Sequence, residues 1–342
     1  MPAEVAENTE KKLTRKDFIS DQDVRWCPGC GDYAILATLQ NVLPKLGIPK
    51  EKYTFISGIG CSSRFPYYME TFGFHSIHGR APTLATGLKS YRPDLSVWVI
   101  TGDGDGLSIG GNHLLHVLRR NVDVKILLFN NRIYGLTKGQ YSPTSEYGKK
   151  TKSSPFGSID HPLNPIKIAL GAEASFVART VDTDVKHMME VFQAAGEHKG
   201  TAFVEILQNC VIFNDGAFHA INDKNTKDEA SLKLEEGQPL IFGKERNKGI
   251  RLKNFEPEVV EFDPEKIPED LIIHNPHQDN PVYAQLLARM EAPLQPVPLG
   301  IFREVQRPTY DDLLNEQIET AIQTQGPGNL EKLLHSGDTW TV

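Results

Sequence analysis

The sequence has no hydrophobic run long enough to cross a membrane and only four cysteines among its 342 residues. A membrane-spanning helix needs about 20 consecutive, mainly apolar residues. The charged N-terminal segment 1–17 lacks the apolar stretch of a secretory signal. Four cysteines in a chain of this size are too few for a disulfide scaffold. We therefore expect a cytoplasmic protein without a membrane partner.

Positive charge is also scarce. The chain carries 37 Lys and Arg against 44 Asp and Glu, a net charge of −7, which argues against nucleic acid as the main partner. Residues 1–220 hold 24 cations and 22 anions, whereas residues 221–342 hold 13 and 22, with 11 prolines in each part. We expect a compact cofactor-binding domain over 1–220 and an irregular, acidic, Pro-rich extension over 221–342 that packs against another subunit.

Short apolar runs alternate with amphipathic stretches over the first 220 residues. Runs rich in β-branched and aromatic residues predict buried strands at 53–57, 96–101, 124–130, 175–180 and 202–207. Apolar residues spaced by three and four predict helices at 33–43, 82–91, 112–120 and 184–198. This alternation predicts an α/β fold whose mostly parallel sheet is covered by helices on both faces. Such folds bind ligands at the carboxyl ends of their strands.

Two of these strands lead into polar motifs. The run 96–101 continues into Gly-Asp-Gly-Asp-Gly at 102–106, and the run 124–130 ends in Asn130-Asn131. One right-handed crossover accounts for the 25 residues between Gly104 and Asn130, so both motifs should meet at one edge of the sheet. Glycines allow a diphosphate to approach the backbone, and the oxygens of Asp103 and Asn131 suit Mg²⁺. The pair of motifs resembles the thiamine-diphosphate signature.

The four cysteines allow three interpretations. Cys27 and Cys30 form a Cys-Pro-Gly-Cys motif, Cys61 lies in Gly-Ile-Gly-Cys-Ser-Ser, and Cys210 follows the last core strand. They could form a redox disulfide, bind structural zinc or hold a 4Fe-4S cluster. Two of them stand alone, unlike the paired motifs of zinc ribbons. A cluster beside thiamine diphosphate would accept electrons one at a time, so we favour iron–sulfur.

The chain resembles a known family, the β subunits of 2-oxoacid:ferredoxin oxidoreductases. The likeness covers residues 26–218 and runs through WCPGCGDYAIL, GIGCSSR, HGRAPTLATGLK, GDGDGLSIGGNH, NNRIYGLTKGQYSPTS and the late Cys210. Within the family it is most similar to the 2-oxoglutarate enzyme, also called 2-oxoglutarate synthase. The resemblance implies a thiamine-diphosphate-binding fold with Mg²⁺ and one 4Fe-4S cluster.

The resemblance also implies a role for individual residues. The cluster ligands fall on Cys27, Cys30, Cys61 and Cys210, and the magnesium ligands on Asp103, Asn131 and the carbonyl of Ile133. The cofactor contacts fall on Ile59, Gly60, Cys61, Ser62, His78, Gly104, Asp105, Gly135, Leu136 and Thr137. Arg64 and Leu136 correspond to the substrate pocket, and Lys138 to a lysine that binds coenzyme A. Arg64 and Lys138 each have an ordinary alternative as a solvated surface charge.

The implied function is the oxidative decarboxylation of a 2-oxo acid, with 2-oxoglutarate giving succinyl-CoA, CO₂ and two electrons for ferredoxin. In this family a separate α subunit contributes the glutamate that activates the cofactor, and no glutamate in residues 26–140 stands out for this task. The expected partners are therefore the α subunit, ferredoxin, the 2-oxo acid and coenzyme A, in a dimer of αβ heterodimers.

Other functions remain open at this point. The 2-oxo acid could be pyruvate or another acid, and a non-redox thiamine decarboxylase or acetolactate-type synthase would share the cofactor but lack the four cysteines. A zinc-stabilised, non-catalytic subunit of another enzyme would use the cysteines without the chemistry. Iron, sulfide and zinc contents distinguish the last two of these alternatives from an iron–sulfur oxidoreductase.

Overall fold

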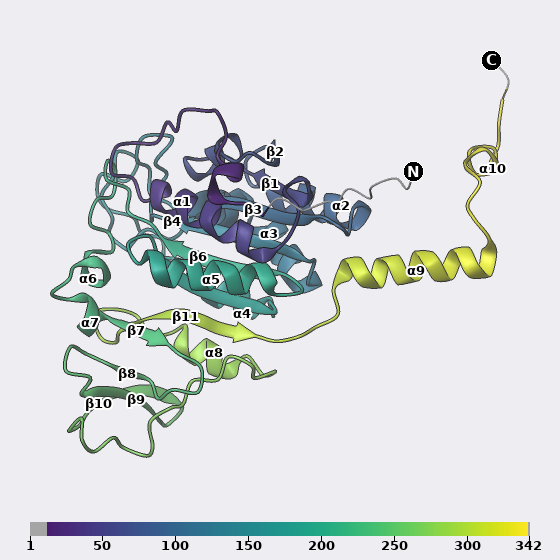
Figure 1. Cartoon of the computed structure of the whole chain (residues 1–342). Helices are drawn as coiled ribbons and strands as arrows, with labels where there is room; N and C mark the ends of the chain where they lie inside the picture. Colours follow the sequence, from purple (N-terminus) through teal and green to yellow (C-terminus); the bar gives the residue numbers. More distant parts are fainter. Residues whose placement is uncertain (1–11, 341–342) are drawn as a thin grey trace, which may run out of the picture.

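The computed structural model describes residues 12–340. Residues 1–11 of the N-terminal segment 1–17, which lacks the pattern of a secretory signal, lie outside the described part, as do residues 341–342. An eight-stranded sheet with the order β2-β1-β3-β4-β6-β5-β11-β7 forms its centre (Figure 1). These strands are β2 Phe72–His75, β1 Tyr53–Ser57, β3 Ser96–Gly102, β4 Val124–Asn130, β6 Ala202–Leu207, β5 Phe176–Val181, β11 Val297–Glu304 and β7 Ser231–Leu234. Neighbouring strands are parallel except β11 and β5, which confirms the predicted mostly parallel sheet.

Helices cover both faces of the sheet, as the sequence predicts. The helices α1 (Asp32–Val42) and α5 (Val185–Glu197) pack on one face. The other face is covered by α2 (Ala81–Tyr91), α3 (Gly111–Arg120), α4 (Pro165–Gly171) and α8 (Val282–Leu287). Successive strand residues alternate between the two sides, so Phe55 packs toward α1 and α5 whereas Ile56 packs on the opposite face. The central strands β4, β5 and β6 are consequently buried on both faces, and their sequences are mainly apolar.

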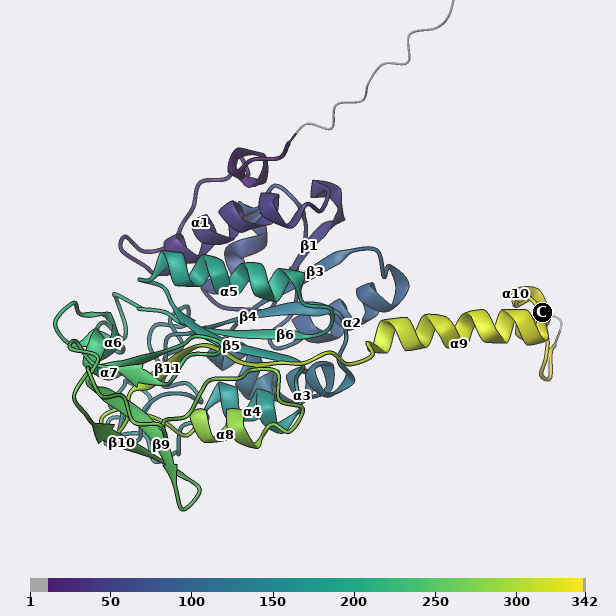
Figure 2. The same ribbon diagram turned by 60° about the horizontal axis from the view of Figure 1, so that its bottom comes forward.

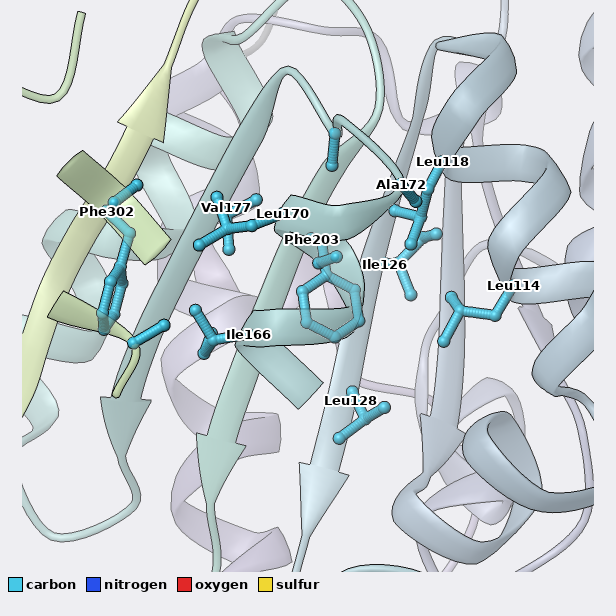
Figure 3. Packing of buried hydrophobic residues seen from close by; sticks show 14 of the residues in the cluster. Leu114, Leu118, Ile126, Leu128, Ile166, Leu170, Ala172, Val177, Phe203 and Phe302 are labelled. Carbon is cyan, nitrogen blue, oxygen red and sulfur yellow. The ribbon is translucent and has the colours of Figure 1, made fainter. Parts of the chain in front are cut away.

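The core on the α2–α3–α4 side connects the two ends of the sheet. Figure 3 shows Leu114 and Leu118 of α3 at one side of this cluster and Phe302 of β11 at the other, with Phe203 between them. All four side chains are at most 1% exposed. Burying each such side chain stabilises the fold by roughly 1.5–3 kcal/mol. A residue from beyond position 220 is therefore part of the same core as the first helices.

The predicted elements of the first 220 residues agree with the structure to within two residues. All five predicted strands and four predicted helices are present. The N-cap of α5 is Asp184, whose side chain accepts a hydrogen bond from the backbone N–H of His187. The sequence analysis missed β2 and α4. The strand β2 has four exposed residues on the sheet edge, and α4 has only seven residues, so neither produces a clear periodic pattern.

The C-terminal extension is more ordered than its composition predicts. The strands β7 and β11 join the main sheet, and β8 (Ile241–Phe242), β9 (Lys248–Lys253) and β10 (Glu256–Glu261) form a small antiparallel sheet. Two short helices, α6 (His219–Asn222) and α7 (Lys227–Ala230), lead into it. Figure 1 and Figure 2 show α9 (Tyr310–Gln325) and α10 (Leu330–Leu334) projecting away from the rest of the molecule. No helix within residues 12–340 has the length and apolar character needed to cross a membrane.

A buried histidine makes the stability of this fold depend on pH. Burial, and then the nearby Lys125 ammonium, lower the pKa of His198 to about 4. Its Nε2 lies 2.8 Å from the Ser175 hydroxyl, and the residue is 4% exposed. Between pH 6.5 and pH 4 the unfolded chain binds a proton at this position that the folded chain does not. Folding is then progressively opposed as the pH falls.

We predict that this histidine alone lowers the free energy of unfolding by about 3 kcal/mol between pH 7 and pH 4, because each pKa unit corresponds to about 1.4 kcal/mol. Guanidinium unfolding of the wild type and of His198→Gln across this range measures the effect. The variant should show a shallower fall, whereas the exposed control His335→Gln should follow the wild type. Equal slopes for all three proteins would contradict the prediction.

Candidate active site

Four loops meet at one edge of the sheet, where the strands β1, β3, β4 and β6 end. These strands are neighbours and all run in the same direction. The chain passes from β1 outward to β2 and then returns to β3 on the other side of β1, so the strand order changes direction between β1 and β3. In open α/β sheets the ligand crevice lies at such a switch point. The segments 58–62 and 102–106 follow β1 and β3 there.

The buried carboxylate of Asp105 ties these loops together. Its Oδ1 accepts hydrogen bonds from the backbone N–H groups of Ile59 (3.0 Å) and Gly79 (2.7 Å), and its Oδ2 accepts one from the Thr101 hydroxyl (2.6 Å). The Nδ1 of His78 lies 2.6 Å from the same Oδ1. Asp105 therefore uses its oxygens within the protein, and it also begins the π-helical turn η5 (Asp105–Ile109).

Asp103, the other carboxylate of this turn, points to different partners. It is 2% exposed, and its Oδ2 accepts hydrogen bonds from the hydroxyls of Ser142 (2.5 Å) and Thr144 (2.6 Å). Burial raises the pKa of Asp103 to about 6 despite these bonds. A carboxylate in this position is a suitable ligand for a hard cation, because the cation would offset the cost of burying its charge.

The amide of Asn131 has a defined orientation. Its Nδ2 donates to the Oε1 of Gln208 (2.9 Å), and its Oδ1 accepts from the backbone N–H of Ile133 (3.2 Å). The oxygen is therefore directed toward the Ile133 turn. Asp103, Asn131 and Ile133 all line one cavity of about 170 Å³. The adjacent ends of β3 and β4 thus bring the three predicted magnesium ligands together, as the crossover length implies.

The same cavity holds every residue that the sequence analysis assigned to the cofactor. Its lining includes Ile59, Gly60, Cys61, Ser62, His78, Gly104, Asp105, Gly135, Leu136 and Thr137. The side chain of His78 lies against Asp105, so this histidine also helps to hold the loop. The ring of Tyr134 closes over Gly104, and its hydroxyl donates to the Gly104 carbonyl (3.1 Å). A Cβ on Gly104 would lie only 2.2 Å from a ring atom of Tyr134.

The four cysteines line a second cavity of about 190 Å³, although they lie far apart in the sequence. Cys27 and Cys30 precede α1, Cys61 precedes the 3₁₀ helix η4 (Ser62–Tyr68), and Cys210 follows β6. All four are free thiols. The CxxC turn is closed by a hydrogen bond from the Cys30 N–H to the Cys27 carbonyl (3.0 Å) and requires a left-handed backbone at Gly29, where φ is +81°.

This second cavity disfavours isolated thiolates. Burial, and then the carboxylate of Asp32, raise the pKa of Cys61 to about 12 and raise the pKa of Cys30 above its ordinary value. Asp32 is 1% exposed and lines both cavities. Burial, and then Asp182, raise the pKa of Asp32 to about 7. A group that bound these sulfurs as thiolates would therefore have to supply positive charge.

The three predicted substrate residues occupy different positions. Leu136 lines both cavities and is 45% exposed. Arg64 lines the cysteine cavity but not the cofactor cavity, and it donates from its guanidinium to the Arg25 carbonyl (2.8 Å). Lys138 is exposed and lines neither cavity, and its φ of +76° places it at a tight turn. The structure thus brings Leu136 and Arg64 close to the cysteines and leaves Lys138 on the surface.

Several residues of the site were missed by sequence reasoning. Asp32 and Gln208 line both cavities, and the indole N–H of Trp26 donates to the Cys61 carbonyl (2.7 Å). Ser142 and Thr144 hold Asp103. Asp32 directly follows the Cys-Pro-Gly-Cys-Gly motif, and Gln208 lies two residues before Cys210. Their closeness to the cysteines in the sequence is the signal that could have identified Asp32 and Gln208 as site residues.

Comparison with known proteins identifies the family of this chain. The family model described as the C-terminal TPP-binding domain of thiamine pyrophosphate enzymes matches residues 58–206. The 2-oxoglutarate oxidoreductase subunit KorB of Mycobacterium tuberculosis is 57% identical over 337 residues, which cover 98% of this chain and 90% of that protein. The chain belongs to the β-subunit family of 2-oxoacid:ferredoxin oxidoreductases.

Other members of the β-subunit family agree with this placement. The 2-oxoacid:ferredoxin oxidoreductase subunit beta of Saccharolobus solfataricus is 44% identical over 213 residues, which cover 62% of this chain and 68% of that protein. A solved structure of 2-oxoglutarate:ferredoxin oxidoreductase from Magnetococcus marinus, with 2-oxoglutarate, coenzyme A and succinyl-CoA bound, matches with a TM-score of 0.74 and 33% identity. That match covers 96% of both chains. The predicted family and fold are confirmed.

The contact between Gly104 and Tyr134 leads to a prediction for this β subunit. In Gly104→Ala the added methyl group would push the Tyr134 ring from its position in the cavity wall. We expect thiamine diphosphate affinity to fall by at least about tenfold, because small displacements in such sites are costly. Titration of intrinsic fluorescence with the cofactor measures this. The control Gly111→Ala adds its methyl group to open space and should bind normally. Unchanged affinity in Gly104→Ala would show that the ring moves freely.

Proposed function

We propose that this chain is the β subunit of a 2-oxoglutarate:ferredoxin oxidoreductase. One 2-oxoglutarate and one coenzyme A thiol give succinyl-CoA, CO₂, one proton and two electrons, and two oxidised ferredoxins each take one electron. The observation that carries this proposal is that the cofactor cavity and the cysteine cavity share Cys61, Asn131, Gly135, Leu136, Asp32 and Gln208 in their walls. Electrons released in the first cavity would need to travel only a short distance to the second.

The residues of the first cavity fit thiamine diphosphate with Mg²⁺. Asp103, Asn131 and the Ile133 carbonyl would supply three oxygens of the octahedron that Mg²⁺ prefers, and the diphosphate and water would supply the others. Gly102 and Gly104 keep the backbone accessible beside them. When bound, the cofactor supplies the bond-breaking chemistry of decarboxylation. The protein's part is to hold the metal and to shape the pocket.

The residues of the second cavity fit a 4Fe-4S cluster better than zinc. A Cβ on Gly135 would lie 3.5 Å from the Cys61 sulfur and 3.7 Å from the Cys210 sulfur, so the absence of a side chain there leaves space beside both thiols. Zinc needs its ligands to converge on one point at about 2.3 Å. A cluster spreads its ligands around a larger volume. The positive charge of its irons would stabilise the cysteine thiolates, which burial otherwise disfavours.

The remaining part of the active site would come from an α subunit. No glutamate among the described residues lines either cavity. The edge strand β2, next to the cofactor loop, exposes Phe72 (63%) and Phe74 (51%), and Ile77 beyond it is 75% exposed. An apolar sheet edge of this kind is usually covered by a partner. We propose that the α subunit covers the β2 edge and places the missing glutamate beside His78 at the cofactor cavity. The complete enzyme would be a dimer of αβ heterodimers.

We further propose roles for the two parts of the chain. All residues assigned above lie between Cys27 and Cys210, within the first 220 residues. Residues 221–342 would serve subunit packing, with α9 and α10 as the projecting element. We place the enzyme in the cytoplasm, where thiols stay reduced and available to bind iron.

The experiment that tests the proposed function is metal analysis of anaerobically purified wild type and Cys210→Ser. We predict four irons and four sulfides per wild-type chain, with broad absorbance near 400 nm, and a large loss of both in the variant, since three thiolates hold a cubane poorly. About one zinc per chain without sulfide would instead indicate a zinc-stabilised subunit. Full iron and sulfide in Cys210→Ser would show that the fourth ligand is wrong.

Specificity for 2-oxoglutarate leads to a prediction for Arg64. A guanidinium can bind the distal carboxylate that pyruvate lacks, and removing it would leave that carboxylate poorly partnered. In Arg64→Met, kcat/KM for 2-oxoglutarate should fall by roughly 30-fold or more, corresponding to about 2–4 kcal/mol. For 2-oxobutyrate the fall should be small. Arg25→Met is a matched control, because Arg25 is a neighbouring arginine with an exposed side chain. Equal losses for both substrates would mean that Arg64 supports the fold or the cluster.

A further inference from the structure

The surface beside Cys210 is basic, in contrast to the rest of the chain. Residues 132–154 contain five cations, Arg132, Lys138, Lys149, Lys150 and Lys152, and one acid, Glu146, for a local charge of +4. The whole chain has a charge of −7. Arg132 (2.9 Å) and Lys149 (3.9 Å) both pair with Glu146, so Lys150 and Lys152 are the exposed cations that determine the sign of the hairpin surface. Two acids lie close to these segments in the sequence: Asp160, which follows the hairpin and is exposed, and Asp215, which accepts a hydrogen bond from the Asn209 side chain.

Three of these lysines lie on an ordered hairpin. The segment 148–158 is closed by backbone hydrogen bonds from Gly148 to Ser158 (2.7 Å) and from Ser158 to Lys149 (2.9 Å). Thr151 and Ser154 exchange backbone hydrogen bonds within it. Lys150 and Lys152 are exposed on this hairpin, and Phe156 is 98% exposed. The backbone that carries these lysines is therefore preformed.

The hairpin contacts the turn that carries Cys210. The ammonium of Lys149 is hydrogen bonded to the side-chain oxygen of Asn214, and the backbone N–H of Asn214 donates to the Cys210 carbonyl (3.0 Å). Within this turn Ile212 is 57% and Phe213 is 37% exposed, and both line the cysteine cavity. The wall of the cysteine cavity thus continues into an apolar patch with lysines beside it.

We infer that this lysine surface, formed by Lys149, Lys150, Lys152, Phe156, Ile212 and Phe213, is the docking site of the electron acceptor, an acidic iron–sulfur protein. The inference rests on the proposed function, since electrons must leave the cysteine cavity for a carrier. Each docking event would transfer one electron, so one turnover requires two oxidised carriers and releases two reduced ones. Small interfaces with complementary charge are typical of electron-transfer partners.

Other parts of the surface suit an acidic carrier less well. Arg25, which also lines the cysteine cavity, is paired with Asp23 (3.2 Å), and both line a surface hollow with Asp21, so that hollow is of mixed charge. The projecting helix α9 has four acids, Asp311, Asp312, Glu316 and Glu319, and no cation. An acidic protein would be repelled there. The lysine surface is both complementary in charge and continuous with the cavity.

The test uses the complete enzyme with its α subunit and compares wild type with Lys150→Glu/Lys152→Glu. Oxidation of 2-oxoglutarate with coenzyme A is followed with ferredoxin and, separately, with methyl viologen, a small cationic dye. We expect the KM for ferredoxin to rise by at least about tenfold in the variant, because electrostatic attraction accelerates association by 10–10³. The KM of the wild type should rise with salt, and that of the variant should respond less. Activity with the dye should be unchanged.

The matched control is Lys16→Glu/Lys45→Glu, which makes the same charge change at two exposed lysines near the opposite ends of the strands. It should leave the KM for ferredoxin unchanged. Wild-type enzyme that reduces neither acceptor would refute the proposed function itself. Wild-type activity together with an unaltered ferredoxin KM in Lys150→Glu/Lys152→Glu would overturn the docking site. A raised KM for coenzyme A alone, or loss of the α subunit on gel filtration, would assign the surface to those partners and equally overturn it.

Discussion

The site depends on one buried carboxylate that connects three loops. Asp105 accepts hydrogen bonds from Thr101 at the end of β3, from the Ile59 N–H after β1 and from the Gly79 N–H after β2, with His78 beside it. The neighbouring Asp103 lines the same cavity but has other partners, the hydroxyls of Ser142 and Thr144. Two acids two residues apart thus bind different parts of the protein, and only Asp105 connects the loops that follow β1 and β2.

Most of the fold around this site could be predicted from the sequence because its central strands are buried on both faces. Runs such as 124–130 and 202–207 are mainly apolar and buried throughout, and they match β4 and β6 at each end. The motifs at 102–106 and 130–131 could be placed together because one crossover separates them, and β3 and β4 are indeed parallel neighbours. The cysteines could be grouped by their chemistry, and all four line one cavity.

The rest could not be predicted because it depends on contacts that sequence patterns do not record. The strand β11 pairs antiparallel with β5, although it begins at Val297, 116 residues after β5 ends at Val181. Its Phe302 completes a core formed mainly by the first 220 residues. Composition alone describes that region as acidic and Pro-rich. Asp32 and Gln208 are similar cases, since each is an ordinary polar residue until the fold places it between the two cavities.

Gln208 shows how closely the two cavities are joined. Its Oε1 accepts a hydrogen bond from Asn131, which faces the cofactor cavity, and its Nε2 lies 3.3 Å from the Cys30 sulfur and donates to it. One side chain on the loop after β6 therefore orients a proposed metal ligand on one side and contacts a cysteine on the other. Because β4 and β6 are adjacent and parallel, their ends bring these groups together without any flexible connection. The sheet edge thus sets the distance between the two cavities, which the electron transfer proposed above would require to be short and fixed.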